Sequence, residues 1–233
     1  MALVKFDRGL FTNGNSAKGL NYGQIEPNQV WFDRAGMVEA QCKLDTDDFS
    51  DAQVAPNVVG GKTGTAAATN KIVAEVGAFL QIDKATYTAS VPTKAGKTAG
   101  MPVGVNYSSE KLYNQFAPQR RNFFLTTNDW LPRIGYVERG MRITTNTVMF
   151  DDTTYAPTAA SSASKVAFDT IQAAIGTGQV VYAAVRDGSD GELILGITPD
   201  ATEDIILAQV VAAYTNADRT CSFMFQILDG GTK

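Results

Sequence analysis

Short apolar runs separated by turn-forming residues dominate the chain after residue 70, and the last of them alternates with a period of two residues. In the last run, Cys221, Phe223, Phe225 and Ile227 alternate with Ser222, Met224 and Gln226. Successive side chains of a strand point to opposite faces, so a period of two residues predicts a strand with one buried face.

The other runs of this kind are rich in β-branched or aromatic residues and are bounded by Gly, Pro, Asn or Asp. They predict strands at 72–76, 79–82, 86–91, 102–107, 122–126, 134–137, 141–145 and 148–150. Two further pairs predict hairpins, 180–186 with 193–197 and 205–215 with 220–228, because turn-forming residues separate their members. The segment 204–214 also fits a helical period, so a helix stays open there as the alternative.

One helix is predicted, at about 162–175. Ser161 or Ser162 can cap it, a moderate apolar stripe runs along it, and Gly176 can end it. The stretch 94–100 predicts an exposed loop instead. The expected fold class is therefore mainly β, an antiparallel β-sandwich or barrel-like domain with one short helix and a long irregular N-terminal arm.

The first part of the chain differs from the rest. Clusters of Gly, Asn and Pro interrupt scattered aromatic residues, and the stretch 46–69 is small and polar. Short strands are expected there only at 30–32 and 38–44. The sequence therefore predicts two parts, an extended N-terminal arm and loop at 1–70 and a β-rich domain at 71–233.

Composition and charge fit a globular protein. Of 233 residues, 44% are hydrophobic and 19% are charged, which excludes a wholly disordered chain. With 20 Lys and Arg against 24 Asp and Glu the net charge is -4, so no direct nucleic-acid binding is expected. No run of about 18 apolar residues and no signal-peptide core is present, so we expect a soluble, non-secreted protein without membrane contact.

The candidate chemistry is limited by what the chain lacks. It has no His, which removes Ser-His-Asp and Cys-His catalysis and His-ligated metal sites. Cys42 and Cys221 are too few for a structural zinc site. A single disulfide is open to them, but buried free thiols are the expected state. We expect neither an enzyme nor a cofactor or metal.

Several short strings imitate catalytic motifs without the context that those motifs need. Residues 61–63 and 96–98 both read Gly-Lys-Thr, but Pro56 and Val91 stand where a phosphate-binding P-loop requires its first Gly. Both strings are therefore interpreted as loops. The Ser-x-x-Lys string at 162–165 is better explained as a helix cap than as a nucleophile motif.

Paired carboxylates are the remaining candidates for catalysis. Asp47 and Asp48 are adjacent, as are Asp151 and Asp152, and a glycoside hydrolase uses two such groups across a sugar. Solvated loop charges are the expected role of both pairs, so a carboxylate-dependent glycoside hydrolase is kept only as a remote alternative. The string 187–191 resembles a calcium loop but lacks the oxygen ligand at its fifth position, which predicts a tight turn.

Three segments within 75–150 have a distinctive pattern. They are Glu-Val-Gly-Ala-Phe-Leu-Gln-Ile-Asp at 75–83, Asn-Tyr-Ser-Ser-Glu-Lys-Leu-Tyr at 106–113, and Trp-Leu-Pro-Arg-Ile-Gly-Tyr with Gly-Met-Arg-Ile-Thr-Thr-Asn at 130–146. In these segments the chain resembles head decoration or cement proteins of tailed bacteriophages. The likeness continues more weakly through the final hairpin. It implies a β-rich fold, no catalysis, and binding over subunits of the major capsid protein.

Aromatic and Arg residues are enriched at the energetic centres of protein interfaces. We therefore expect contacts at Phe6, Phe11, Trp31, Phe32, Arg120 and Arg121, with core packing as the alternative for the aromatic residues. The expected partners are the major capsid protein and copies of the chain itself, on the capsid exterior of a virion assembled in the host cytoplasm. Another phage assembly subunit, such as a tail tube, head fibre or adhesin, is the alternative.

Overall fold

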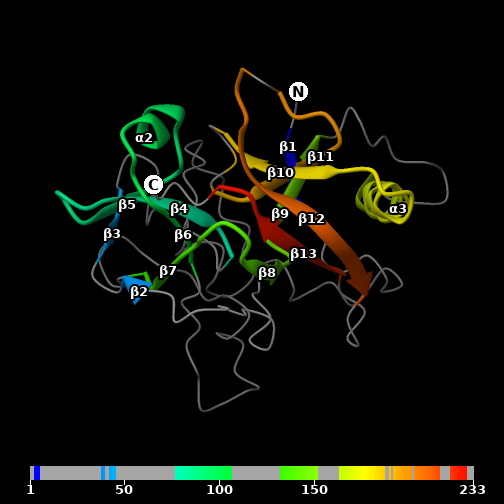
Figure 1. The fold of residues 1–233 in the computed structure, drawn as a ribbon, viewed down its shortest axis with the longest axis horizontal. Coiled ribbons are helices and arrows are strands. Elements are labelled where there is room, and N and C mark those ends of the chain that lie inside the picture. Colours follow the sequence, from blue (N-terminus) through cyan, green and yellow to red (C-terminus); the bar gives the residue numbers. More distant parts are fainter. Residues whose placement is uncertain are drawn as a thin grey trace, which may run out of the picture.

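The computed structural model describes about half of the chain. The described residues are 3–5, 38–39, 42–45, 77–106, 132–151, 163–186, 189, 191–200, 202–215 and 221–229. They form two mixed β-sheets and two helices (Figure 1). The predicted mainly β fold class is thus confirmed.

The larger sheet has seven strands. Their order across the sheet is β1 (Leu3–Lys5), β9 (Val148–Asp151), β11 (Leu193–Gly196), β10 (Val181–Val185), β12 (Ile205–Thr215), β13 (Cys221–Ile227) and β8 (Arg142–Thr145). All neighbours are antiparallel except β11 and β9, which are parallel. Both predicted hairpins are therefore confirmed.

The seven-stranded sheet curls into a barrel-like shape because one short stretch of backbone, residues 142–151, supplies strands near both of its edges. β8 is an edge strand, whereas β9 lies five strand positions away, which in a flat sheet is about 24 Å. Only Asn146 and Thr147 separate the two strands along the chain, and such a link spans at most about 11 Å. The sheet must therefore curve until its two sides approach each other at 142–151.

The curled sheet encloses the main hydrophobic core. Alternate residues of its strands share one buried cluster, including Val148, Phe150, Val181, Ala183, Val185, Leu193, Leu195, Ile205, Leu207, Phe223, Phe225 and Ile227. Helix α3 (Ala163–Gly176) packs against β12 and β10, and its Phe168 meets Phe223 edge-on with ring centroids 5.7 Å apart. The observed helix matches the predicted one to within one residue at each end.

The smaller sheet has six strands and packs against the larger one. Their order is β2 (Val38–Glu39), β7 (Ile134–Tyr136), β6 (Val103–Asn106), β4 (Phe79–Asp83), β5 (Thr88–Ser90) and β3 (Lys43–Leu44), with β3 and β5 parallel. Phe79 joins the main core, whereas Leu80 and Ile82 join a second cluster on the opposite face. The alternation along β4 therefore places this sheet between two cores.

The two sheets are joined by a backbone contact at the start of β4. The amide of Phe79 donates a hydrogen bond of 2.7 Å to the carbonyl of Gly191, and Gly191 has a φ of 80°. A Cβ at Gly191 would lie 2.5 Å from the Phe79 carbonyl oxygen, so only glycine permits this approach.

The structure corrects one local prediction and decides another. Residues 94–98 form a short helix, α2 (Lys94–Thr98), where an exposed loop was predicted, because Thr93 caps it by accepting a hydrogen bond from the Gly96 amide at 3.0 Å. The segment 205–215 is a strand rather than the alternative helix, since it pairs with β10 and β13 on either side. Cys42 and Cys221 are buried free thiols, as predicted.

Short strands from the first 45 residues belong to both sheets. β1 pairs with β9, β2 with β7, and β3 with β5. Strands expected near 38–44 are thus present, in two pieces, whereas those expected at 30–32, 72–76 and 122–126 lie outside the described residues. The division of the chain at residue 70 stays a prediction for the rest of the N-terminal range.

Candidate functional site

The residues predicted to contact a partner cannot be placed. Phe6, Phe11, Trp31, Phe32, Arg120 and Arg121 all lie outside the described residues. The same holds for Asp47, Asp48, Asp152 and the side chain of Asp151. The structure therefore neither brings these groups together nor separates them, and the candidate sites below come from other residues.

The second Gly-Lys-Thr string lies at the end of α2 and has a structural role. The Lys97 ammonium group forms an ion pair of 2.8 Å with Asp229, which follows β13, and a Cβ at Gly96 would clash with the Gln81 side chain at 2.0 Å. Beside these residues and Thr93 is a cavity of about 10 Å³, which has room for about one water molecule. This segment holds α2 against the sheets and leaves no space there for a nucleotide.

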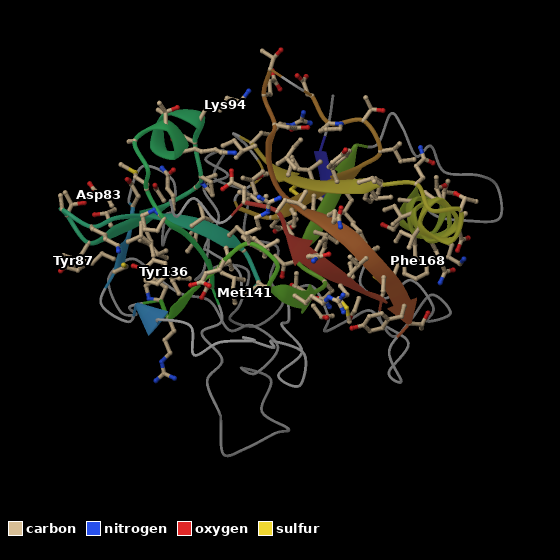
Figure 2. All side chains as sticks on the ribbon, viewed as in Figure 1. Asp83, Tyr87, Lys94, Tyr136, Met141 and Phe168 are labelled. Carbon is tan, nitrogen blue, oxygen red and sulfur yellow. The ribbon has the colours of Figure 1, made fainter. Side chains whose placement is uncertain are left out.

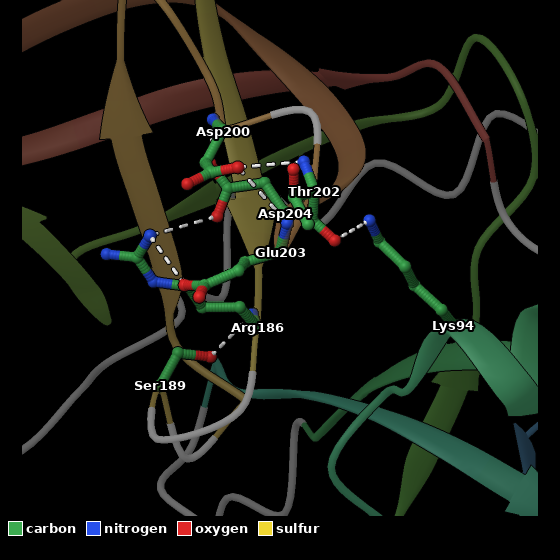
Figure 3. Close-up of polar contacts among 7 residues, drawn as sticks. All are labelled: Lys94, Arg186, Ser189, Asp200, Thr202, Glu203 and Asp204. Atoms are coloured by element: carbon green, nitrogen blue, oxygen red, sulfur yellow. Dashed lines mark hydrogen bonds and ion pairs between the residues drawn. The ribbon is translucent and has the colours of Figure 1, made fainter.

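Among the residues that the structure describes, the densest group of charged side chains surrounds Arg186, which directly follows β10 (Figure 3). We call Arg186, Asp200, Glu203 and Asp204 the Arg186 cluster. The three carboxylates lie in the loop before β12. The Arg186 guanidinium lies 3.5 Å from the Asp204 carboxylate and 3.7 Å from that of Glu203. The side chains of Arg186 and Asp204 are 10% and 7% exposed, so their charges offset each other in a largely buried place.

Hydrogen bonds within the same loop fix its carboxylates. Asp204 Oδ2 accepts a bond of 2.7 Å from the Asp200 amide. Asp200 Oδ1 accepts bonds of 2.7 Å and 3.2 Å from the amides of Thr202 and Glu203. These bonds, that from Thr202 first, hold the pKa of Asp200 below its ordinary value of 3.8, because they favour the ionised form.

The Arg186 cluster also connects the two sheets. The Lys94 ammonium group at the start of α2 donates a hydrogen bond to the carbonyl of Thr202, and the Ser189 hydroxyl accepts one from the Arg186 amide at 3.3 Å (Figure 3). Asp204 Oδ1 accepts no hydrogen bond from the described residues, yet its charge faces Arg186. The contacts of this cluster position a loop and a helix, so its chemistry is structural.

A second feature of interest is the hairpin between β4 and β5. Asp83 Oδ1 accepts a hydrogen bond of 2.8 Å from the Ala85 amide, and Asp83 Oδ2 accepts one of 2.9 Å from the Thr86 hydroxyl. These bonds, that from Ala85 first, lower the pKa of Asp83. The turn that they form ends at Tyr87, which lies at the outer end of the hairpin (Figure 2). We call residues 84–87 the hairpin tip.

The hairpin tip was not found from the sequence, which placed Tyr87 inside a strand at 86–91. The strand begins only at Thr88, because Tyr87 has a φ of 55°. An Asp side chain often forms a turn by accepting hydrogen bonds from groups two or three residues later. Asp83, followed by Thr86, was therefore a sign in the sequence that a turn could form here. The exposure of Tyr87 has no comparable signal in the sequence.

Comparisons of the chain with protein-family models, curated proteins and solved structures found no match. In the described part of the chain no three Cys, Asp or Glu side chains are grouped so that they could hold a metal ion. Neither described helix is long and apolar enough to cross a membrane. The resemblance of 75–150 to phage decoration proteins therefore stays a prediction, and the function is proposed below from the geometry.

Proposed function

We propose that the chain is a non-enzymatic structural protein that binds and stabilises the exterior of a phage capsid, as a decoration or cement protein. The observation that carries the proposal is the position of the described segments among the first 45 residues, 3–5, 38–39 and 42–45. Their short strands form one edge of the seven-stranded sheet, as β1, and both edges of the six-stranded sheet, as β2 and β3.

Segments laid along sheet edges suit a protein that binds a repeated surface. The edge of a sheet presents backbone groups with which an extended segment can pair. An extended arm covers a large area at modest affinity for each contact, and repetition over many copies raises the total strength of binding. The major capsid protein and neighbouring copies of the chain are the partners that this arrangement fits.

The use of the described charged groups agrees with this function. The Arg186 cluster holds the loop before β12, and Lys97 holds α2 to the end of β13. These groups stabilise a rigid body from which arm segments and loops can reach a partner. The predicted contacts at Phe6, Phe11, Trp31, Phe32, Arg120 and Arg121 belong to this proposal.

Binding to shells tests the proposal directly. The purified protein is mixed with empty capsid shells of the phage that encodes it, prepared without it, and the mixture is sedimented. We expect saturable co-sedimentation and greater resistance of the shells to heat. No binding to shells would reject the proposal, and assembly of the protein alone into rings would favour the tail-tube alternative.

A further inference from the structure

The smaller sheet is closed by one short segment that supplies both of its edge strands. β2 and β3 lie at opposite edges, five strand positions apart, which in a flat sheet is about 24 Å. Only residues 40–42 lie between them along the chain, and such a link spans at most about 14 Å. The sheet must therefore curve until its two edges approach each other. We call residues 38–39 and 42–45 the strap, because they connect these edges.

The strap covers the second hydrophobic cluster, which lies between it and the sheet. Cys42 and Leu44 of the strap are buried in this cluster. A Cβ at Gly104 of β6 would lie 2.4 Å from Cγ2 of Ile134, so the glycine leaves room for the sheet to close. The members that come from the sheet itself are Leu80, Ile82, Ala89, Ile134 and Tyr136. The strap thus shields an apolar lining from solvent.

The described contacts that hold the strap are few. Each of its strands has two residues and pairs on one side only, β2 with β7 and β3 with β5. The Lys43 amide donates a further hydrogen bond of 2.8 Å to the Tyr87 carbonyl, and the Asp45 amide donates one of 2.8 Å to the Ala89 carbonyl. Segments with few buried apolar contacts are those that open locally. The strap is therefore held less firmly than the inner strands of either sheet.

The rest of the smaller sheet does not depend on the strap. β7, β6, β4 and β5 pair in series without it. The Phe79 amide at the start of β4 is bonded to Gly191, and the lysines of α2 are bonded to Thr202 and Asp229. These contacts fasten the sheet to the strands of the larger one. Detachment of the strap therefore uncovers the second cluster and leaves the main core intact.

We infer that the strap is a movable closure, which detaches from β5 and β7 as one unit while both sheets stay folded, and which then opens the second cluster to solvent. It moves as one unit because residues 40–42 join its two strands and because Cys42, within that link, packs in the same cluster as Leu44. This conformational device goes beyond the proposed function and does not rest on it.

Two buried thiols report on the opening, because Cys42 lies in the strap and Cys221 lies in β13 of the larger sheet. The full-length protein is alkylated with iodoacetamide under native conditions, and each site is followed by mass spectrometry. Each rate is divided by the rate of the same site in urea, which removes differences in intrinsic reactivity. We expect Cys42 to react at least about tenfold faster than Cys221. Equal rates would show that the strap opens only with global unfolding and would overturn the inference.

A substitution within the strap tests whether the opening is local. Leu44→Ala should speed the reaction of Cys42 by about tenfold or more, because it removes a buried side chain of the strap, and should leave that of Cys221 unchanged. Lys43→Ala is the matched control, since Lys43 is the exposed neighbour in the same strand, and both rates should stay within about twofold. An equal rise at both thiols in Leu44→Ala would make the strap part of the main folding unit, against the inference.

A disulfide that locks the strap closed gives an independent test. Lys43 and Thr88 are paired between β3 and β5, and they face away from the cluster because Leu44 and Ala89 face into it. Lys43→Cys combined with Thr88→Cys therefore places two thiols within reach of a disulfide. The oxidised form should be alkylated at Cys42 at least about tenfold more slowly than the reduced form. An unchanged rate would reject the movable closure and, because no capsid shells are used, would leave the proposed function standing.

Discussion

At the scale of single residues, glycine positions decide how closely the two sheets approach. Gly191 and Gly178 have the same φ of 80°, but only Gly191 faces another backbone, with its missing Cβ 2.5 Å from the Phe79 carbonyl oxygen. Nothing lies within 4 Å of the corresponding point at Gly178. A comparison of alanine substitutions at the two glycines therefore separates the effect of a positive φ on stability from the effect of a clash with a neighbouring backbone.

Gly191→Ala is expected to reduce the free energy of unfolding more than Gly178→Ala does. Both changes add the strain of a left-handed alanine, about 1–2 kcal/mol, and Gly191→Ala adds a backbone clash that forces β4 away from the Gly191 carbonyl. Urea unfolding of the two variants measures the difference, which we expect to be at least about 1 kcal/mol. Equal losses would show that the sheets are not held together at this contact.

The residue scale also shows why the site was harder to predict than the fold. Residue type and spacing indicated Arg120 and Arg121 as interface candidates. Residue type and spacing do not, however, reveal the φ angle of a residue or the exposed fraction of its side chain. Tyr87 stands out only through these two properties. A pattern of β-branched and aromatic residues runs through Tyr87 without a break, so the strand predicted from the sequence begins two residues earlier than β5 does.

At the scale of elements, the sequence predicted strands well where burial alternates or a turn is marked. The final hairpin, β12 with β13, was expected from its period and its polar turn. Helix α2 was missed because its five residues have no apolar stripe and include a glycine. Its stability comes from contacts that a pattern search does not detect, namely the Thr93 cap and the packing of Gly96 on Gln81.

Thr93→Ala is expected to destabilise α2. The Thr93 hydroxyl accepts hydrogen bonds from the Gly96 amide at 3.0 Å and from Gln81 Nε2 at 3.4 Å, and loss of such a cap costs about 1 kcal/mol. Thr98→Ala is the matched control, because its exposed hydroxyl only donates back to the Lys94 carbonyl and should change stability by less than about 0.5 kcal/mol. Chemical denaturation checks both values, and an equal effect would contradict the capping role.

At the scale of the whole molecule, central strands and edge strands differ in how firmly they are held. β12 lies between β10 and β13 and pairs with both, and its residues reach the main core. β3, in contrast, is an edge strand of two residues that pairs with β5. The order of strands could not be predicted from the sequence, because pairing between distant segments leaves no local pattern.

Hydrogen exchange should follow this difference. We expect amides of β10, β12 and β13 to exchange slowest, and those of β3 and α2 to exchange at least about tenfold faster, because edges and short helices open without global unfolding. Exchange followed by mass spectrometry on peptides from these elements measures the rates. Protection of β3 equal to that of β12 would contradict the assignment of the main core to the larger sheet.

The backbone at 142–151, which supplies both β8 and β9, also sets the order in which the barrel can form during synthesis. β9 pairs with the earlier strand β1 and with β11, and β8 pairs with β13, so each of the two strands has a partner that leaves the ribosome later. Closure requires the chain to have emerged past Ile227. A nascent chain stalled before Cys221 leaves the edge of β8 unpaired and open to aggregation, so the sheet can close only after β13 has been translated.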